Sequence, residues 1–435
     1  MRTVKHVTCP VCGCLCDDLE LTIKDEKVVK VKNGCALCKA KFLGYSKHRV
    51  LKPLVRKNGR FFEVSYEEAV SRAAEILTEA NYPLLYGWSM TSCEAVSAGI
   101  ELAEEIGGVI DTTSTLCHGP STLGIQDVGI SSATLGQVRH RADLIVYWGS
   151  NPLIAHPRHM ERYTIFRKGR FQKEKRKLIV VDVRKTETAE TADIFLQIKP
   201  NMDYEVLQAL RALIRDQELD VDEVAGIPTE RLEEIADTMV ECRFGALFFG
   251  SGLTMTRGKN RNIDAVLSLV SDLNKLTKFI AMPMRGHFNV TGADMILTWQ
   301  TGYPYAVDFS LGYPRYNPGE TSAVDILLRE ESDAALVVAS DPVASLPRKA
   351  AEHLAENPLI VVDPHMSATA RMADVVLPST FVGIESGGTA YRMDHVPLPL
   401  KKIVEPPEGI LSDEEILRII LSEVKRKKAE QMENP

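Results

Sequence analysis

Cysteine is concentrated at the start of this 435-residue chain. Of the nine cysteines, six lie before residue 40, and these are Cys9, Cys12, Cys14, Cys16, Cys35 and Cys38. The opening stretch MRTVKHVTCP lacks the apolar core of a secretory signal peptide, so we expect a reducing, cytoplasmic location. In that setting, closely spaced cysteines favour metal binding or catalysis over disulfides.

Two kinds of metal site are compatible with these spacings. Cys9, Cys12 and Cys16 follow a C-x2-C-x3-C pattern, which together with one distant cysteine is typical of a [4Fe-4S] cluster. The pairs 9/12 and 35/38 also have the C-x2-C spacing of a structural zinc site. Residues 17–34 alternate like a β-hairpin, which would return the later cysteines to the first loop. From these residues alone, iron and zinc are equally supported.

A second group of residues is suited to chemistry at a metal centre. Cys117 and His118 precede a Gly-Pro turn into a predicted helix, where a thiolate is stabilised and a soft metal favours sulfur. Arg285 follows an apolar run and precedes a glycine, and its planar side chain can hold both oxygens of a carboxylate. The ordinary alternative is a buried cysteine beside a satisfied histidine.

The elements that must position these residues are strands alternating with helices. Amphipathic helices are predicted over 66–80 and 93–107, and buried strands over 82–88, 142–149, 177–183, 245–252, 333–340 and 358–364. Near-continuous apolar strands bounded by turn residues predict an α/β fold with parallel sheets covered on both faces. Ligands in such sheets lie at the carboxyl ends of the strands.

Several of these strands end in similar motifs. LIVVDVRKTETAETAD and LIVVDPHMSATARMAD each place an Asp at the strand end, followed by a Thr and an Ala-Asp pair. Asp182 and Asp363 can accept hydrogen bonds from ribose hydroxyls or a guanine amino group, and two glycines near residue 250 suit a pyrophosphate. The sequence therefore predicts two nucleotide half-sites, formed by Gly149, Asn151, Asp182, Arg184, Thr186, Gly250, Gly252, Asp341, Asp363 and Thr369.

Charge and hydropathy exclude some functions. The net charge of −7 and a pI near 5.9 argue against nucleic-acid binding. No apolar run reaches the roughly 18 residues of a membrane helix, so membrane insertion is not expected.

The chain resembles the molybdopterin oxidoreductase superfamily in CPVCGCLCDD, the short hairpin, NGCALCKAKF and the α/β body that follows. The resemblance implies a [4Fe-4S] cluster beside a pterin, with a lysine after the fourth cysteine bridging the two. Cys35 stands six residues before Lys41, a spacing similar to the formylmethanofuran dehydrogenase branch. Cys38 is closer to the general formate dehydrogenase pattern, but the position two residues later is Ala40. We expect Cys9, Cys12, Cys16 and Cys35 as ligands, with Cys38 as the alternative to Cys35.

Further motifs resemble the catalytic subunits of formylmethanofuran dehydrogenases from about residue 8 to the last helix. They are YGWS, CHGP, NPLIAHPRHM, RGHFNVTG and GTAYRM. The resemblance implies two Rossmann-like domains holding two molybdopterin guanine dinucleotides. It also implies that Cys117 ligates tungsten or molybdenum, that His118 assists proton or hydride movement, and that Arg285 holds the carboxylate.

The function implied by this resemblance is that of a catalytic subunit. It would reduce CO2 to formate with electrons delivered through the cluster, for formylmethanofuran synthesis in methanogenesis. The alternatives are the catalytic subunit of a formate dehydrogenase, a non-catalytic electron-transfer subunit with the same fold, and a zinc-binding scaffold. Tungsten and molybdenum are not distinguished by the sequence.

The expected organisation has four parts. They are an iron–sulfur domain over 1–52, a first pterin-binding domain over 53–115 plus 290–410, a second over 116–289, and a C-terminal helix and tail over 411–435. Formate dehydrogenases continue into a β-barrel that covers the pterins, and we expect no such barrel in this chain, so a separate barrel subunit is expected. The resemblance also implies an amidohydrolase-like subunit and a ferredoxin-like electron-supply subunit as partners.

Overall fold

The computed structural model describes residues 1–433. Their contacts divide the chain into two compact units. The first unit combines residues 1–116, 287–392 and the segment from 397 through the C-terminal helix, and the second combines 117–286 with 393–396. Residues 1–52 and the C-terminal helix thus group with the first unit, while the four-part division remains a prediction.

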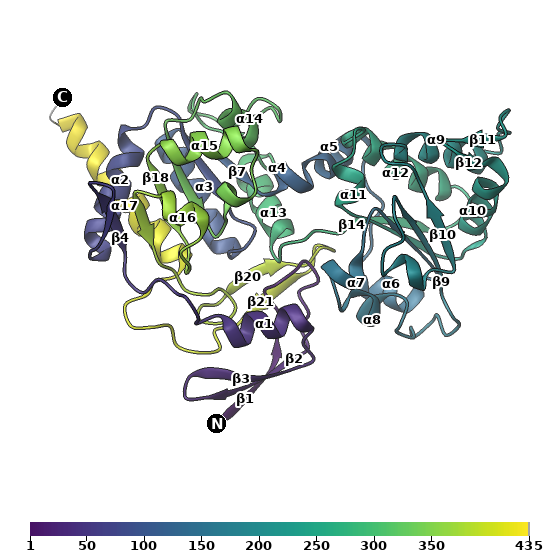
Figure 1. Cartoon of the computed structure of the whole chain (residues 1–435), viewed down its shortest axis with the longest axis horizontal. Coiled ribbons are helices and arrows are strands. Elements are labelled where there is room, and N and C mark those ends of the chain that lie inside the picture. The colour runs from purple at the N-terminus through teal and green to yellow at the C-terminus, as the bar shows by residue number, and fades with distance from the viewer. Residues whose placement is uncertain (434–435) are drawn as a thin grey trace. The chain divides into compact units, whose positions relative to one another are not determined.

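A mixed sheet forms the centre of the first unit (Figure 1). Its five parallel strands are β7 (Val109–Thr112), β6 (Pro83–Gly87), β17 (Ala334–Val338), β18 (Leu359–Val362) and β19 (Val375–Leu377). Antiparallel strands extend both edges, namely β15 (Val307–Asp308) and β16 (Arg315–Tyr316) on one side and β4 (Leu54–Lys57) and β5 (Arg60–Glu63) on the other. The short strands β15 and β16 were not predicted.

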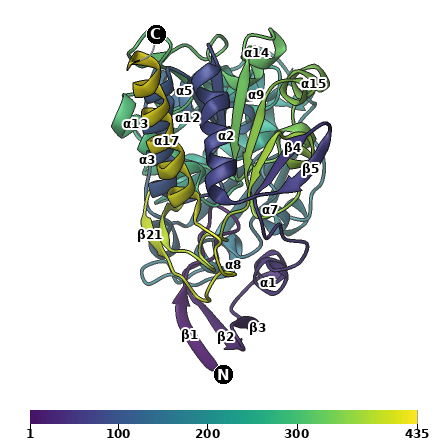
Figure 2. The same ribbon diagram turned by 90° about the vertical axis from the view of Figure 1, so that its left-hand side faces the viewer.

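Both faces of this sheet are covered. Leu85 and Leu336 face a core formed with helices α2 (Tyr66–Glu79), α3 (Cys93–Ile106), α13 (Val290–Thr301) and α17 (Asp413–Glu433). Figure 2 shows α2 and α3 lying beside α17. Leu84 and Val337 point to the other face, against α14 (Ala323–Leu328) and α15 (Arg348–Glu356). Successive residues of a strand point to opposite faces, so the continuous apolar runs supply both cores.

The N-terminal segment is a small antiparallel sheet with one helix. Strands β1 (Arg2–Val7), β2 (Leu19–Lys24) and β3 (Lys27–Lys32) precede α1 (Ala36–Gly44). The predicted hairpin is confirmed: β2 pairs with β3, and the turn residues Asp25 and Glu26 have positive φ. A second hairpin, β20 (Gly388–Tyr391) and β21 (Pro397–Leu400), lies near the end of the chain.

The second unit has a five-stranded sheet that is parallel throughout. Its order is β10 (Ile194–Gln197), β9 (Lys177–Asp182), β8 (Leu144–Trp148), β13 (Gly245–Phe249) and β14 (Phe279–Pro283). One face packs on α9 (Asp203–Ile214), α10 (Thr229–Glu241) and α12 (Asn260–Leu273). The predicted α/β architecture with parallel sheets is confirmed in both units.

Two further expectations concern helices. The predicted C-terminal helix is α17, and the last two residues of the predicted tail lie outside the described residues. Among the described helices, none combines the length and the apolar character that crossing a membrane requires.

Candidate functional site

The N-terminal cysteines lie in the loop between β1 and β2 and at the start of α1. Cys9, Cys14, Cys16 and Cys38 are buried, whereas Cys12 and Cys35 are partly exposed. Two backbone hydrogen bonds close the loop, from Cys9 N to Cys16 O at 2.9 Å and from Leu15 N to Cys12 O at 3.0 Å. None of the nine cysteines, all within the described part of the chain, forms a disulfide.

Electrostatics show which thiols are neighbours. A hydrogen bond to Cys38 raises the pKa of Cys9 well above its usual value, and burial and the charges of Cys38, Cys16 and Cys12 act in the same direction. This accumulation of thiols fits a group that takes up several thiolates together. Within residues 1–433, however, no three or more His, Cys, Asp or Glu side chains form a preformed metal-binding arrangement.

Cys14 and Cys35 each have a specific hydrogen bond. Cys14 is the surplus thiol of the loop, because it stands outside the C-x2-C-x3-C pattern, and a hydrogen bond from it lowers the pKa of Cys12. Cys35 is the N-cap of α1, and its Sγ accepts the backbone N–H of Cys38 at 3.4 Å.

Lys41 lies near Cys9 and near Asp363, which is one of the predicted nucleotide residues. Burial lowers the pKa of Lys41, and the opposing influences are the charges of Asp363, Cys9 and Asp413. Its Nζ lies 5.0 Å from the centroid of the Phe381 ring, which is a cation–π distance. Burial raises the pKa of Asp363 to about 7. The structure thus brings Lys41 near both Cys9 and Asp363.

The other predicted nucleotide residues of the first unit bond to each other. Asp341 Oδ1 accepts the backbone N–H of Thr369 at 2.8 Å and its hydroxyl at 2.6 Å. Asp341 Oδ2 also accepts the N–H of Ala368, the first residue of α16 (Ala368–Met372). These contacts are those of a helix-capping carboxylate.

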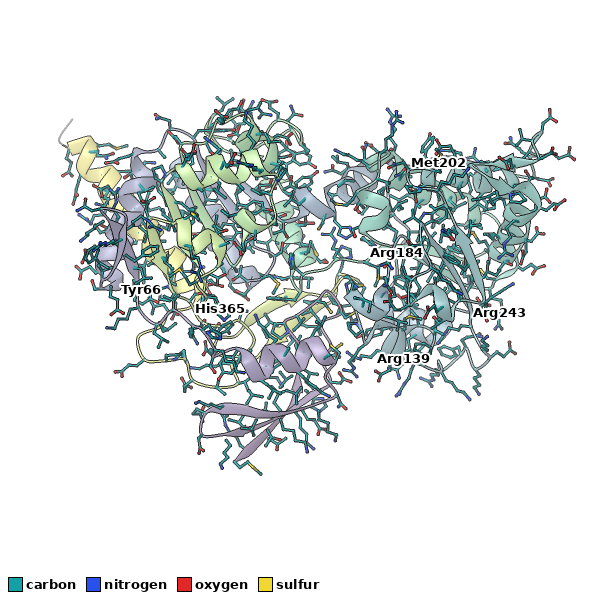
Figure 3. All side chains as sticks on the ribbon, in the orientation of Figure 1. Tyr66, Arg139, Arg184, Met202, Arg243 and His365 are labelled. Atoms are coloured by element: carbon teal, nitrogen blue, oxygen red, sulfur yellow. The ribbon has the colours of Figure 1, made fainter. Side chains whose placement is uncertain are left out.

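The second unit brings six predicted residues to one pocket of about 320 Å³. They come from the ends of β8, β9 and β13, and they are Gly149, Asn151, Asp182, Arg184, Thr186 and Gly250. Figure 3 labels Arg184 among the side chains of this unit. The pocket lies at the carboxyl ends of parallel strands, which is where α/β sheets bind ligands.

Glycine is required where two loops of this pocket meet. Gly149 has φ +54°, and a Cβ there would lie 2.7 Å from the carbonyl carbon of Gly252. Gly252 N donates to Gly149 O at 3.0 Å. Gly252 therefore supports the pocket wall, although it does not line the pocket.

The sequence did not indicate Glu187 or Thr188, which bond to the pocket residue Asn151. Asn151 Nδ2 donates to Glu187 Oε2 at 2.7 Å, and Thr188 Oγ1 donates to Asn151 Oδ1, also at 2.7 Å. Both residues follow Thr186 in the strand-end motif, so the signal was present in the sequence.

Cys117 and His118 join two short helices. Cys117 ends α4 (Ser114–Cys117), and His118 precedes α5 (Gly119–Val128). The Cys117 carbonyl accepts the hydroxyl of Thr254 at 2.7 Å. His118 is buried, with Nδ1 3.0 Å from Ser121 Oγ and Nε2 3.2 Å from Met284 O. Burial, reinforced by the Arg285 charge, lowers the pKa of His118 to about 3, so its imidazole is neutral at pH 7.

Arg285 follows the end of β14 and lies near His118. It is 5% exposed, and its carbonyl accepts the Nε2–H of His156 at 2.8 Å. His118 and the backbone that carries Arg285 therefore meet within the second unit, and Cys117 directly precedes His118; the catalytic constellation of the three residues stays a prediction. His156 was missed, because its contact is with the backbone of a residue 129 positions away.

Comparison with known proteins identifies relatives over nearly the whole length. A family model described as molybdopterin oxidoreductase matches residues 49–423. The B subunit of tungsten-containing formylmethanofuran dehydrogenase 2 from Methanocaldococcus jannaschii is 51% identical over 98% of this chain and 99% of that protein. The protein of the same name from Methanococcus maripaludis is 47% identical, with the same coverage of both chains.

A solved structure shows the same fold at low identity. Acetylene hydratase from Pelobacter acetylenicus superposes with a TM-score of 0.74 at 16% identity. The match covers 98% of this chain and 70% of that protein.

Proposed function

Because the chain belongs to the molybdopterin oxidoreductase family, and within it to the formylmethanofuran dehydrogenase B subunits, we propose that it is the catalytic subunit of a formylmethanofuran dehydrogenase. It reduces CO2 to formate, and the formate is then used for formylmethanofuran synthesis. The observation that carries this proposal is the contact of His118, the neighbour of Cys117, with the backbone just before Arg285, beside a pocket at the carboxyl ends of the parallel strands.

The proposed cofactors are a [4Fe-4S] cluster, two molybdopterin guanine dinucleotides and tungsten or molybdenum. Cys9, Cys12, Cys16 and Cys35 would hold the cluster, with Cys38 as the alternative to Cys35. The gathered thiols and the location of Lys41 near both Cys9 and Asp363 support this assignment.

The dinucleotides would be held by both units. The pocket residues Gly149, Asn151, Asp182, Arg184, Thr186 and Gly250 would hold one of them, with Gly252 supporting the wall. Asp363 is the best-supported residue for the other. Asp341 and Thr369 already bond to each other, so their contribution there would be to fix the backbone around α16.

Each residue of the constellation has a distinct proposed role. Cys117 would hold the metal centre through its thiolate, and that centre would supply the two-electron redox chemistry by which CO2 and one proton become formate. The Arg285 guanidinium would orient the carboxylate oxygens through two parallel hydrogen bonds. His118, neutral at pH 7 with its proton on Nε2, would take a proton at Nδ1, at the cost of the bond from Ser121, and would return it from the same nitrogen.

The two most similar relatives described above are each named as one component of a larger enzyme, which supports assembly into a multi-subunit complex. We propose a barrel subunit over the pterins, an amidohydrolase-like subunit that uses the formate, and a ferredoxin-like subunit that supplies electrons.

Metal analysis and product analysis of the purified complex test the function. We expect tungsten or molybdenum, about four iron atoms per cluster, and formylmethanofuran formed from CO2 and methanofuran under a low-potential reductant. Formate without formylmethanofuran would favour a formate dehydrogenase. Iron without tungsten or molybdenum would indicate an electron-transfer subunit, and zinc alone a scaffold.

A further inference from the structure

Two buried histidines hold the backbone that carries Arg285. His156 Nε2 lies 2.8 Å from the carbonyl oxygen of Arg285, and His118 Nε2 lies 3.2 Å from that of Met284. A carbonyl oxygen can only accept, so both imidazoles carry a proton on Nε2 and donate it. Two successive peptide groups are therefore fixed by side chains from different elements, because His118 precedes α5 and His156 follows α7 (Pro152–Ala155).

These contacts begin where the β ladder ends. Met284 N donates to Phe249 O at 2.8 Å, which is the last bond between β14 and its neighbour β13. Arg285 N then turns back to Pro283 O at 3.2 Å. Beyond this point the peptide after Arg285 is no longer held by a strand, and its buried carbonyl needs a donor. His156 supplies that donor.

We infer that His156 is a positioning residue for Arg285. Its hydrogen bond fixes the peptide plane after Arg285, and with it the direction in which the guanidinium leaves the backbone. The inference rests on the proposed function, in which Arg285 orients the carboxylate. Misplacing such a group by about 1 Å costs on the order of a hundredfold in rate.

A neighbouring histidine provides a matched control. His159 is equally buried, but its Nδ1 pairs with Tyr147 OH at 2.9 Å, and its ring packs on Phe248 with centroids 4.8 Å apart. It therefore stabilises the core near His156 without holding the backbone at residues 284 and 285.

The experiment compares His156→Leu, His156→Gln and His159→Leu in the assembled complex. The readouts are tungsten or molybdenum per chain, Tm, and kcat and KM for formate oxidation with a viologen dye. We expect His156→Leu to keep its metal and lose roughly tenfold to a hundredfold in kcat/KM. The Gln variant should recover most of this loss, because its amide can donate to the same carbonyl. His159→Leu should lower Tm and leave kcat/KM per metal unchanged.

Other outcomes would overturn the inference. Normal kcat/KM in His156→Leu, beside a defective Arg285→Lys, would remove the positioning role and leave the role of Arg285 intact. Normal kinetics in both variants would instead remove Arg285 from the proposed function. If His156→Leu loses its metal, the Gln variant decides: recovery of metal and kcat/KM supports the donor role, and failure of either makes His156 a structural residue only.

Discussion

At the scale of single residues, Arg285 offers the sharpest test of the proposed chemistry. Lysine keeps the positive charge but loses the planar pair of donors that can hold two oxygens. We expect Arg285→Lys to keep metal and pterins while turnover falls by roughly two orders of magnitude. Metal per chain, measured beside formate oxidation with a viologen dye, checks this. Loss of pterin along with activity would mean that Arg285 binds the cofactor, and normal turnover would exclude it from the site.

The fourth cluster ligand is a second question at this scale. Cys35 lies at the N-terminus of α1, and its Sγ already accepts an N–H···S bond, which is a contact that iron–sulfur sites use. Cys38 is buried against Cys9. We expect Cys35→Ser to abolish the electron paramagnetic resonance signal of the reduced cluster and Cys38→Ser to retain it.

A matched control comes from the surplus thiol of the loop. In Cys14→Ser the hydroxyl can still donate to Cys12, so the cluster signal should persist. Loss of the signal in Cys38→Ser with retention in Cys35→Ser would assign the ligand to Cys38.

At the scale of elements, the shape of the proposed nucleotide pocket depends on the close approach of two loops at Gly149 and Gly252. In Gly149→Ala the new methyl group would meet the Gly252 backbone in a conformation that alanine rarely adopts. We expect a loss of about 1–3 kcal/mol of stability and a fall in guanine dinucleotide released per chain, measured by nucleotide analysis of the denatured protein.

Gly136 in α6 (Leu135–Arg141) serves as the control for that substitution. A Cβ there would have ordinary contact with Thr134 Oγ1 at 3.6 Å. Alanine inside a helix is favoured over glycine by about 1 kcal/mol. The Gly136→Ala variant should therefore keep its dinucleotide, and its Tm should be no lower than that of the wild type. A normal dinucleotide content in Gly149→Ala would contradict the proposed pocket.

Elements with strong periodic patterns could be predicted from sequence, and short or polar features could not. The parallel strands were readable because continuous apolar runs such as 177–183 need two covered faces. Strands β15 and β16 have two residues each and leave no pattern. An Asp that follows a strand can have either of two structural roles: Asp182 lines a pocket, whereas Asp341 caps a helix. The sequence around the two residues is similar, so only the tertiary contacts distinguish the two roles.

At the scale of the whole molecule, buried carboxyls make stability depend on pH. Burial raises the pKa of Asp111 to about 7, although it accepts backbone N–H groups from Thr112, Ala306 and Ala323. The folded state therefore holds a proton that the unfolded state releases near pH 4. The resulting stability is complete below that pH and is lost as pH rises through 7.

We expect this contribution, on the order of 4 kcal/mol, to be absent from Asp111→Asn. Denaturant unfolding of the purified chain between pH 4.5 and about 8 should show a falling free energy for the wild type and a flatter dependence for the variant. Asparagine cannot accept the Ala323 N–H through its amide nitrogen, so the variant should also be less stable at low pH. Parallel pH profiles would show that Asp111 is ionised throughout.

The strand order of the first unit has a consequence for synthesis on the ribosome. Strand β6 needs β17 as its neighbour, and β17 begins more than 200 residues after β7 ends. At roughly 5–20 residues per second, the early strands wait on the order of 10–40 s with an unpaired edge. The second unit, nearly all of it contiguous over 117–286, is completed during this wait. The nascent chain therefore has a folded second unit, while the N-terminal strands of the first unit still expose apolar surface and an unpaired edge. Chaperones bind chains in this state.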